Sequence, residues 1–336
     1  MIIKFIKLTA ILMILMSLQN GTSVAKILPR KPRDFLTPVK YAAKAIWNTV
    51  KMDKMEVSLT IIYRKNSKQE EVHLSLSSNQ SVSGLPRSIF KKEIVFITHG
   101  FLSDGDEFWV KDMAEAYLAR KNVVIVTVNW GAGALITIYS KAVKNMIKVA
   151  KMLVDFITNL IEHHRVKASR IHLIGFSLGA HLFGIVGKGI PGIHRITGLD
   201  PARKYFENNT EHRLSKNDAR YVDVVHTNTI DHGFGLPDSV GHVDFYINGG
   251  KIQRGCRSFV KSLDILYRYA CSHGKSVEYF IESIKNIDCV FVGFREMNNS
   301  RYTTAHLGLD TFKQKNTVGD YYIVTNAQSP YCMKWQ

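Results

Sequence analysis

The sequence is short of several features, and each shortage excludes a class of protein. Its 8 prolines and 23 glycines follow no period, which excludes collagen-like and low-complexity chains. Beyond the N-terminus no apolar run reaches about 18 residues, so we expect no transmembrane helix. Acidic residues are scarce: 28, against 45 Lys and Arg, give a formal net charge of +17, which favours an anionic partner such as nucleic acid or a membrane. The hydrophobic fraction of 46% excludes a disordered chain.

The N-terminus has the pattern of a secretory signal peptide. Lys4 and Lys7 supply positive charge before an apolar run over residues 8–18. That run is too short for a bilayer, which takes roughly 20 residues, but it suits a signal peptide. Ser23-Val24-Ala25 is a small-x-small cleavage sequence. We therefore predict that residues 1–25 are removed, that the mature chain starts at Lys26, and that it is secreted into an extracellular setting.

Secretion changes the meaning of the cysteines. An even number of cysteines in an oxidising compartment predicts two disulfides. In one pairing, Cys256 bonds Cys271 and closes a short loop. Cys289 then bonds Cys332 and anchors the C-terminal segment. Three Asn-x-Ser/Thr sequons make candidate glycosylation sites of Asn79, Asn208 and Asn298.

Apolar runs alternate with helical patterns along the middle of the chain. Expected buried strands cover residues 93–98, 122–128, 170–175, 193–199 and 221–226, after a hairpin over 56–63 and 71–76. Expected helices cover residues 107–119, 139–164, 183–187 and 276–284. This alternation predicts an α/β fold whose central, mostly parallel sheet has helices on both faces. We interpret the lysine row Lys141, Lys144, Lys148 and Lys151 as a solvated helix face and not as a nucleic-acid site.

Gly175-Phe176-Ser177-Leu178-Gly179 follows one of these strands and precedes a helical segment. Gly-x-Ser-x-Gly in that setting is typical of a nucleophile elbow, where two glycines avoid side-chain collisions around a tight turn. Ser177 is therefore the candidate nucleophile, and it needs a base and an orienting acid. Asp200 ends the next strand of the sheet, where open α/β sheets place their sites.

The base is harder to choose from spacing. The Ser–Asp–His order of α/β hydrolases requires a histidine after Asp200. Six qualify: His212, His226, His232, His242, His273 and His306. His273 is favoured because we expect it on a loop before a helix and beside a disulfide, while His226 ends a strand and competes. For the oxyanion, we expect donors from the Leu178 N–H and from the Phe101 N–H, after His99-Gly100.

These motifs resemble the pancreatic lipase family. The matching sequences, in the family's order, are Ile97-Thr-His-Gly-Phe101, Gly175-Phe-Ser-Leu-Gly-Ala-His181, Ile196-Thr-Gly-Leu-Asp-Pro-Ala202, Asp223-Val-Val-His-Thr227, Gly241-His-Val-Asp-Phe245, Asn248-Gly-Gly250 and Cys271-Ser-His273. They cover roughly residues 63–284. The C-terminal Tyr321-Tyr-Ile-Val-Thr-Asn326 and Ser329-Pro-Tyr-Cys332 look like the secreted insect phospholipase A1 and lipase branch. The resemblance implies an α/β-hydrolase fold, a Ser177–Asp200–His273 triad, and oxyanion donors at Phe101 and Leu178.

The departures from the family are also informative. Only 63 residues follow His273, too few for the C-terminal β-sandwich of pancreatic lipase, so we expect a single domain over residues 26–336 and no colipase partner. The lid between Cys256 and Cys271 holds 14 residues, which is shorter than in triacylglycerol lipases. Its apolar stripe is Phe259, Val260, Leu263, Leu266, Tyr267 and Ala270, interspersed with Arg257, Lys261 and Arg268, a pattern suited to anionic interfaces.

The family's calcium loop is matched only in part. Glu211, Arg213 and Asp218 fit, but Ser215 stands where an acid is usual. We therefore predict no metal and no cofactor.

The sequence thus predicts a secreted serine ester hydrolase, foremost a phospholipase A1 that cleaves the sn-1 ester, with a neutral triacylglycerol lipase or galactolipase as the alternative. A catalytically dead lipid carrier conflicts with the intact triad. We expect a monomer that binds a phospholipid membrane or lipid interface, with a heparin-like glycan as a further candidate partner and no nucleic acid.

Overall fold

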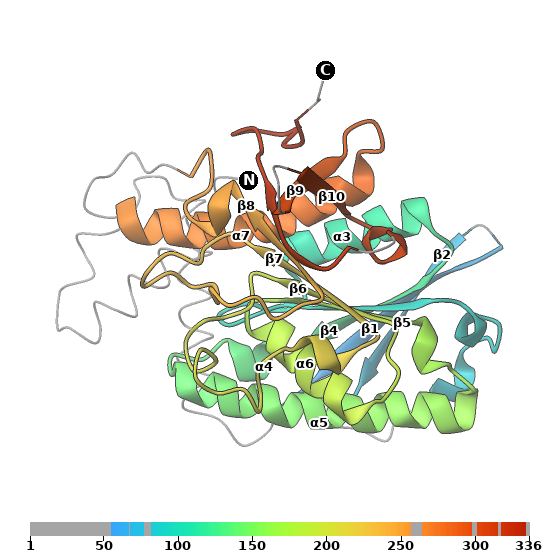
Figure 1. Cartoon of the computed structure of the whole chain (residues 1–336). Coiled ribbons are helices and arrows are strands. Elements are labelled where there is room, and N and C mark those ends of the chain that lie inside the picture. Colours follow the sequence, from blue (N-terminus) through green and yellow to red (C-terminus); the bar gives the residue numbers. More distant parts are fainter. Residues whose placement is uncertain are drawn as a thin grey trace, which may run out of the picture.

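A computed structural model describes residues 55–66, 68–76, 82–256, 264–297, 301–314 and 317–333. The expected signal peptide, the sequons at Asn79 and Asn298, and residues 257–263 of the expected lid lie outside this part. Within it, one sheet of 11 strands runs through the molecule with helices on both faces (Figure 1). The predicted α/β-hydrolase architecture is confirmed.

The strands are ordered β10-β9-β11-β8-β7-β6-β5-β3-β4-β1-β2 across the sheet. Their bounds are β1 Ser58–Lys65, β2 Lys68–Ser75, β3 Ile94–Thr98, β4 Val124–Asn129, β5 Ile171–Phe176, β6 Arg195–Leu199, β7 Tyr221–His226, β8 Val243–Ile247, β9 Phe291–Met297, β10 Arg301–Leu307 and β11 Gly319–Ile323. The run from β4 to β8 is parallel, and β11 adds a further parallel strand beside β8. The predicted hairpin (β1 and β2) and the five predicted buried strands are all present.

The helices cover the two faces of this sheet. They are α3 Phe108–Arg120, α4 Gly131–Ala134, α5 Tyr139–His164, α6 Leu178–Gly189 and α7 Asp264–Lys285. Short 3-10 turns lie at η2 Val82–Gly84, η3 Ile89–Lys91, η4 Ala168–Arg170, η5 Lys216–Asp218, η6 Asn248–Gly250 and η8 Thr311–Lys313. Figure 1 shows α4, α5 and α6 on one face and α3 and α7 on the other.

Each face of the sheet has its own apolar core. One core packs α5 and α6 against the sheet, with Leu153 and Phe183 fully buried, and the other packs α3 and α7, with Tyr117 and Phe280 fully buried. These two cores explain why the central strands are apolar on both sides. The opposite face of α5 is solvated as predicted, because Lys144, Lys148 and Lys151 are exposed and Lys141 is half-buried.

Helix α7 differs from the prediction. We expected His273 on a loop before a helix over residues 276–284, but α7 runs from Asp264 to Lys285 and contains both His273 and Gly274. A glycine inside a helix costs about 0.5–1 kcal/mol. Packing offsets that cost, since Ala270 and Ser272 are buried on the same helix and Cys271 is bonded to Cys256.

The two disulfides pair as predicted. Cys256 joins Cys271, and Cys289 joins Cys332, with Cα–Cα distances of 5.6 and 5.8 Å. The first bond brackets the segment before His273, and the second ties the C-terminal segment to the chain after α7. Among the helices of the described residues, none is long and apolar enough to cross a bilayer.

Candidate active site

Ser177 lies at a sharp turn between β5 and α6. Its backbone has φ 56° and ψ −119°, far from the regions that side chains prefer. A Cβ on Gly175 would lie 2.2 Å from the Gly179 carbonyl oxygen, and one on Gly179 would lie 2.6 Å from the His99 carbonyl oxygen. Only glycine fits at either position, so the steric argument for a nucleophile elbow holds in the structure.

Asp200 follows β6, the strand beside β5. Its fully buried carboxylate accepts the Thr227 N–H at 2.7 Å and the Asn228 N–H at 3.1 Å, both on Oδ1. The other oxygen, Oδ2, accepts a hydrogen bond from His273 Nδ1 at 2.6 Å. The two backbone donors fix the carboxylate, and the carboxylate fixes the tautomer and orientation of the imidazole.

The His273 ring is packed beside the nucleophile. Its centroid lies 4.6 Å from that of Phe176, the residue before Ser177, and the Phe234 ring meets it edge-on at 5.7 Å. His273 is only 6% exposed. Among the described residues, no hydrogen bond joins Ser177 Oγ to His273. Catalytic hydrogen bonds are often long or poorly aligned before substrate binds and tighten in the complex.

His226, the competing histidine, is bound elsewhere. Its Nε2 lies 2.8 Å from Asp244 Oδ1 and its Nδ1 lies 3.0 Å from the Leu236 carbonyl oxygen, so both ring nitrogens face acceptors. Burial lowers the pKa of His226, but the Asp244 carboxylate outweighs burial and raises the pKa above its ordinary value. An imidazolium held between two acceptors is a poor general base, and the structure therefore pairs Asp200 with His273.

The backbone around Gly100 reaches the nucleophile. A Cβ on Gly100 would lie 2.8 Å from Ser177 Cβ and 3.3 Å from Ser177 Oγ. In the described part of the chain, the N–H groups of Phe101 and Leu178 make no turn or loop hydrogen bond to a backbone carbonyl. These are the two backbone donors that an oxyanion hole at Ser177 would use.

His99 orients one of these donors, a role that sequence reasoning did not assign. The Trp130 N–H donates to His99 Nε2 at 3.2 Å, so that nitrogen must be the acceptor and Nδ1 carries the proton. Nδ1 then donates to the Gly100 carbonyl oxygen at 3.0 Å. The Gly100 carbonyl and the Phe101 N–H belong to one trans peptide, so they point in opposite directions. Because His99 holds the carbonyl, the Phe101 N–H is directed away from His99.

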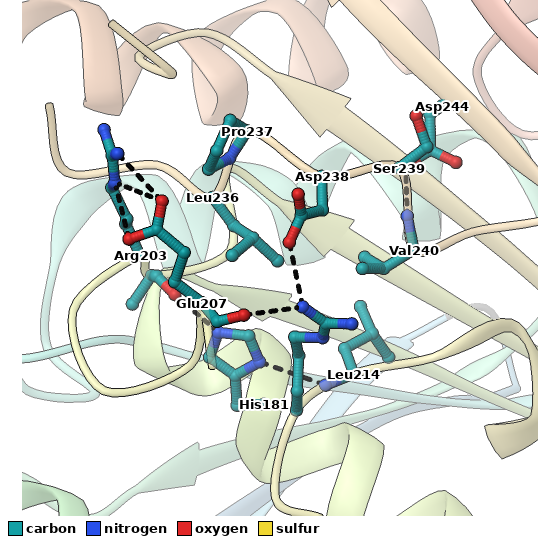
Figure 2. A network of polar contacts seen from close by, with 12 residues as sticks. His181, Arg203, Glu207, Leu214, Leu236, Pro237, Asp238, Ser239, Val240 and Asp244 are labelled. Atoms are coloured by element: carbon teal, nitrogen blue, oxygen red, sulfur yellow. Dashed lines mark hydrogen bonds and ion pairs between the residues drawn. The ribbon is translucent and has the colours of Figure 1, made fainter. Parts of the chain in front are cut away.

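A network of polar contacts holds the segment after Asp200 (Figure 2). His181 on α6 donates from Nε2 to the Ala202 carbonyl oxygen at 2.8 Å and accepts the Leu214 N–H on Nδ1 at 3.1 Å. Burial lowers the pKa of His181 to about 3, which keeps the ring neutral and able to accept. Arg213 bonds Asp238 at 2.9 Å and so links this segment to the one that carries Phe234.

The remaining predicted residues are placed as follows. Asn208 is exposed. In the lid, Leu266, Tyr267 and Arg268 are half-buried on α7 and Ala270 is buried, while Arg257, Phe259, Val260, Lys261 and Leu263 lie outside the described residues.

A family model described as Lipase matches residues 34–331. The chain belongs to the lipase family. Phospholipase A1 of Polybia paulista is 33% identical over 82% of this chain and 88% of that protein, and phospholipase A1 of Vespula vulgaris is 30% identical over 82% and 84%. Inactive pancreatic lipase-related protein 1 of Homo sapiens is 39% identical over 57% of this chain, which there spans only 44% of that longer relative.

Among solved structures, an α/β hydrolase from a deep-sea metagenome library is 16% identical over 66% of this lipase and 78% of that chain, with a TM-score of 0.30. So low a score carries no argument about activity. The family and the site geometry together describe a carboxylic ester hydrolase. Ser177 is on the sharp turn, His273 is held by the buried Asp200, and the backbone at Gly100 approaches the serine.

Proposed function

We propose that this lipase is a secreted phospholipase A1, which hydrolyses the sn-1 acyl ester of membrane phospholipids. The observation that carries the proposal is the match to two wasp phospholipases A1 over 82% of this chain and at least 84% of theirs. The short lid segment between the bonded Cys256 and Cys271 supports it, because a short lid leaves the site open to a phospholipid head group. The alternative activities are neutral triacylglycerol lipase and galactolipase.

The chemistry is a two-step ester hydrolysis. His273 takes the proton of Ser177 as the hydroxyl attacks the ester carbonyl, and Asp200 stabilises the imidazolium that forms. The N–H groups of Phe101 and Leu178 bind the tetrahedral oxyanion. His273 then protonates the departing lysophospholipid oxygen. In the second step it activates water, which releases the fatty acid from Ser177.

An aromatic cluster next to the oxyanion loop supports a lipid surface as the partner. The Phe101 ring meets Tyr139 edge-on at 5.0 Å, and Tyr139 stacks on Tyr205 at 5.7 Å. Lys204 Nζ lies 5.8 Å from the centre of the Tyr139 ring. We call Tyr139, Lys204 and Tyr205 the aromatic shelf. Tyr205 is 52% exposed, and tyrosine and lysine together suit the head-group level of an anionic membrane.

Product analysis on defined vesicles tests the activity. Wild-type protein on phosphatidylcholine and phosphatidylserine with different sn-1 and sn-2 chains should release the sn-1 fatty acid and leave a 2-acyl lysophospholipid. Ser177→Ala, in a chain that still folds, should release nothing. Exclusive cleavage of trioleoylglycerol would establish the neutral lipase instead, and an inert wild-type chain would favour a lipid carrier.

The aromatic shelf has its own test. Lys204→Ala should weaken binding to phosphatidylserine vesicles about fivefold, because one lysine near an anionic surface contributes about 1 kcal/mol. Lys148→Ala is the matched control, since Lys148 is exposed on α5 and outside the shelf. Equal losses in the two variants would show that net charge alone, and not the shelf, attracts the membrane.

We further propose that the chain is exported as a monomeric single domain, cleaved before Lys26, with a glycan on the exposed Asn208. The two disulfides support export, because such bonds persist in oxidising compartments. N-terminal sequencing of the secreted protein and a mobility shift after deglycosylation, absent in Asn208→Gln, test the processing. Retention on a heparin column tests the glycan partner.

A further inference from the structure

The segment over residues 211–218 resembles a calcium loop in part, yet in the structure its oxygens converge on a lysine. Lys188 Nζ lies 2.9 Å from both carboxylate oxygens of Asp218 and 2.8 Å from the carbonyl oxygen of Arg213. Three oxygens of one loop thus bind a single ammonium group. The Asp218 side chain is 2% exposed and the Lys188 side chain is 35% exposed, so a buried carboxylate is paired with a partly exposed lysine.

The oxygens of this loop do not fit a divalent ion. Ser215 donates to the Asp218 carboxylate twice, from Oγ to Oδ1 at 2.9 Å and from its N–H to Oδ2 at 2.8 Å. With the ammonium, these donors already occupy the one carboxylate at the site. Calcium takes 6–8 oxygen ligands and would sit against a positive charge here. Across the described residues, no cluster of three or more His, Cys, Asp or Glu side chains is placed to hold a metal ion.

The charges of the loop also argue against a divalent ion at this place. An acid in place of Ser215 would leave the loop with one more negative charge, which suits a divalent cation. With serine there, Asp218 supplies the one buried carboxylate of the loop, since Glu211 is exposed, and the Lys188 ammonium is its partner. The change at Ser215 and the presence of Lys188 therefore compensate each other within this sequence.

The loop that Lys188 binds packs closely on the helix that carries the nucleophile. A Cβ on Gly187 would lie 2.2 Å from the Asp218 carbonyl oxygen, and one on Gly184 would lie 2.8 Å from Leu214 Cα. His181, one helical turn before Gly184, accepts the Leu214 N–H, a contact that Figure 2 shows. Because α6 begins directly after Ser177, contacts that hold this loop against α6 also restrict movement of the nucleophile elbow.

We propose that the Lys188 ammonium is a built-in cation that takes the place of a structural calcium ion in this lipase. The loop over residues 211–218 and helix α6 are then joined without a divalent metal. The inference concerns the stability of the fold and the elbow, and it is independent of which ester lipid is the substrate.

Thermal unfolding of the full secreted chain tests the proposal. The Tm of the wild type should be the same, within about 1 °C, in EDTA and in millimolar CaCl2. Lys188→Ala should lower the Tm by about 5 °C or more, because a buried carboxylate loses its partner. Lys148→Ala, on the exposed face of α5, is the matched control and should leave the Tm unchanged.

A double variant makes the test reciprocal. Lys188→Ala with Ser215→Asp removes the ammonium and restores the acid, so its Tm should rise by several degrees with CaCl2 and fall again with EDTA. A wild-type chain that loses Tm in EDTA and regains it with CaCl2 would overturn the proposal, and this readout needs no variant to fold. A Lys188→Ala chain as stable as Lys148→Ala, or a double variant indifferent to calcium, would also overturn it.

Discussion

Asp200→Asn separates the chemical role of the aspartate from its structural role. The Asp200 carboxylate uses Oδ1 for two backbone N–H groups and Oδ2 for His273 Nδ1. An asparagine has one oxygen, and that oxygen must face the two N–H donors, since the reverse orientation would leave both donors facing an NH2 group. The NH2 group is then directed at His273, which can only accept it on Nδ1.

This orientation puts the imidazole proton on Nε2, the nitrogen that should take the proton of Ser177. The reverse orientation would forfeit two buried hydrogen bonds, each at about 1–3 kcal/mol, so the unproductive tautomer dominates. We expect kcat to fall by about 10⁴, which corresponds to about 5.4 kcal/mol of transition-state stabilisation. The fold should be kept, because both backbone hydrogen bonds remain.

Initial rates on a soluble p-nitrophenyl ester measure the loss, and thermal unfolding checks the fold. Asp238→Asn is the control, because Asp238 is a carboxylate that bonds Arg213 and, among the described residues, has no hydrogen bond to His273. A folded Asp200→Asn protein that keeps a tenth of wild-type activity would refute the assignment of Asp200 as the residue that fixes the tautomer of His273.

The other predictions concern the elbow and two buried histidines. Gly175→Ala should abolish activity and destabilise the fold by about 3 kcal/mol or more, whereas Gly84→Ala, with no atom within 4 Å of the new Cβ, should change neither. The native pKa of His181 is about 3, so its stabilisation is full above about pH 6.5 and is lost as the pH falls. Unfolding at pH 7 and pH 5 should show the wild type losing about 2 kcal/mol more than His181→Gln. The native pKa of His226 is raised, so its stabilisation is present at low pH and lost as the pH rises, and His226→Gln should cost more at pH 6 than at pH 9.

The parallel core of the sheet could be predicted because its strands are buried on both faces, which leaves unbroken apolar runs in the sequence. The strands β8 to β11 lacked that signal. Strand β11 pairs with β8, with Gly319 opposite Val243. No local pattern predicts a pairing between segments so far apart in the sequence. The length of α7 was missed for a related reason, since packing around Cys271 outweighs the local preference of Gly274.

In the candidate site, too, some residues could be predicted from local sequence and others depend on tertiary packing. The elbow at Ser177 is a local steric problem, so the sequence around it is sufficient. The choice of His273 over His226 depends on which carboxylate each ring meets, and spacing left that open until the family resemblance favoured His273. The partners of Lys188 were not predicted at all, because Asp218 and Arg213 approach it only after α6 and the loop have packed together.

Two of the three residues of the proposed triad, Ser177 and Asp200, have positive backbone φ angles, 56° and 42°. Such conformations cost about 1–3 kcal/mol each in residues with side chains, and glycine relieves the cost. At Ser177, mutation to glycine should therefore relieve backbone strain while removing the proposed nucleophile. Backbone strain is thus concentrated at two residues of the proposed reaction, where the surrounding structure holds conformations that side chains otherwise avoid.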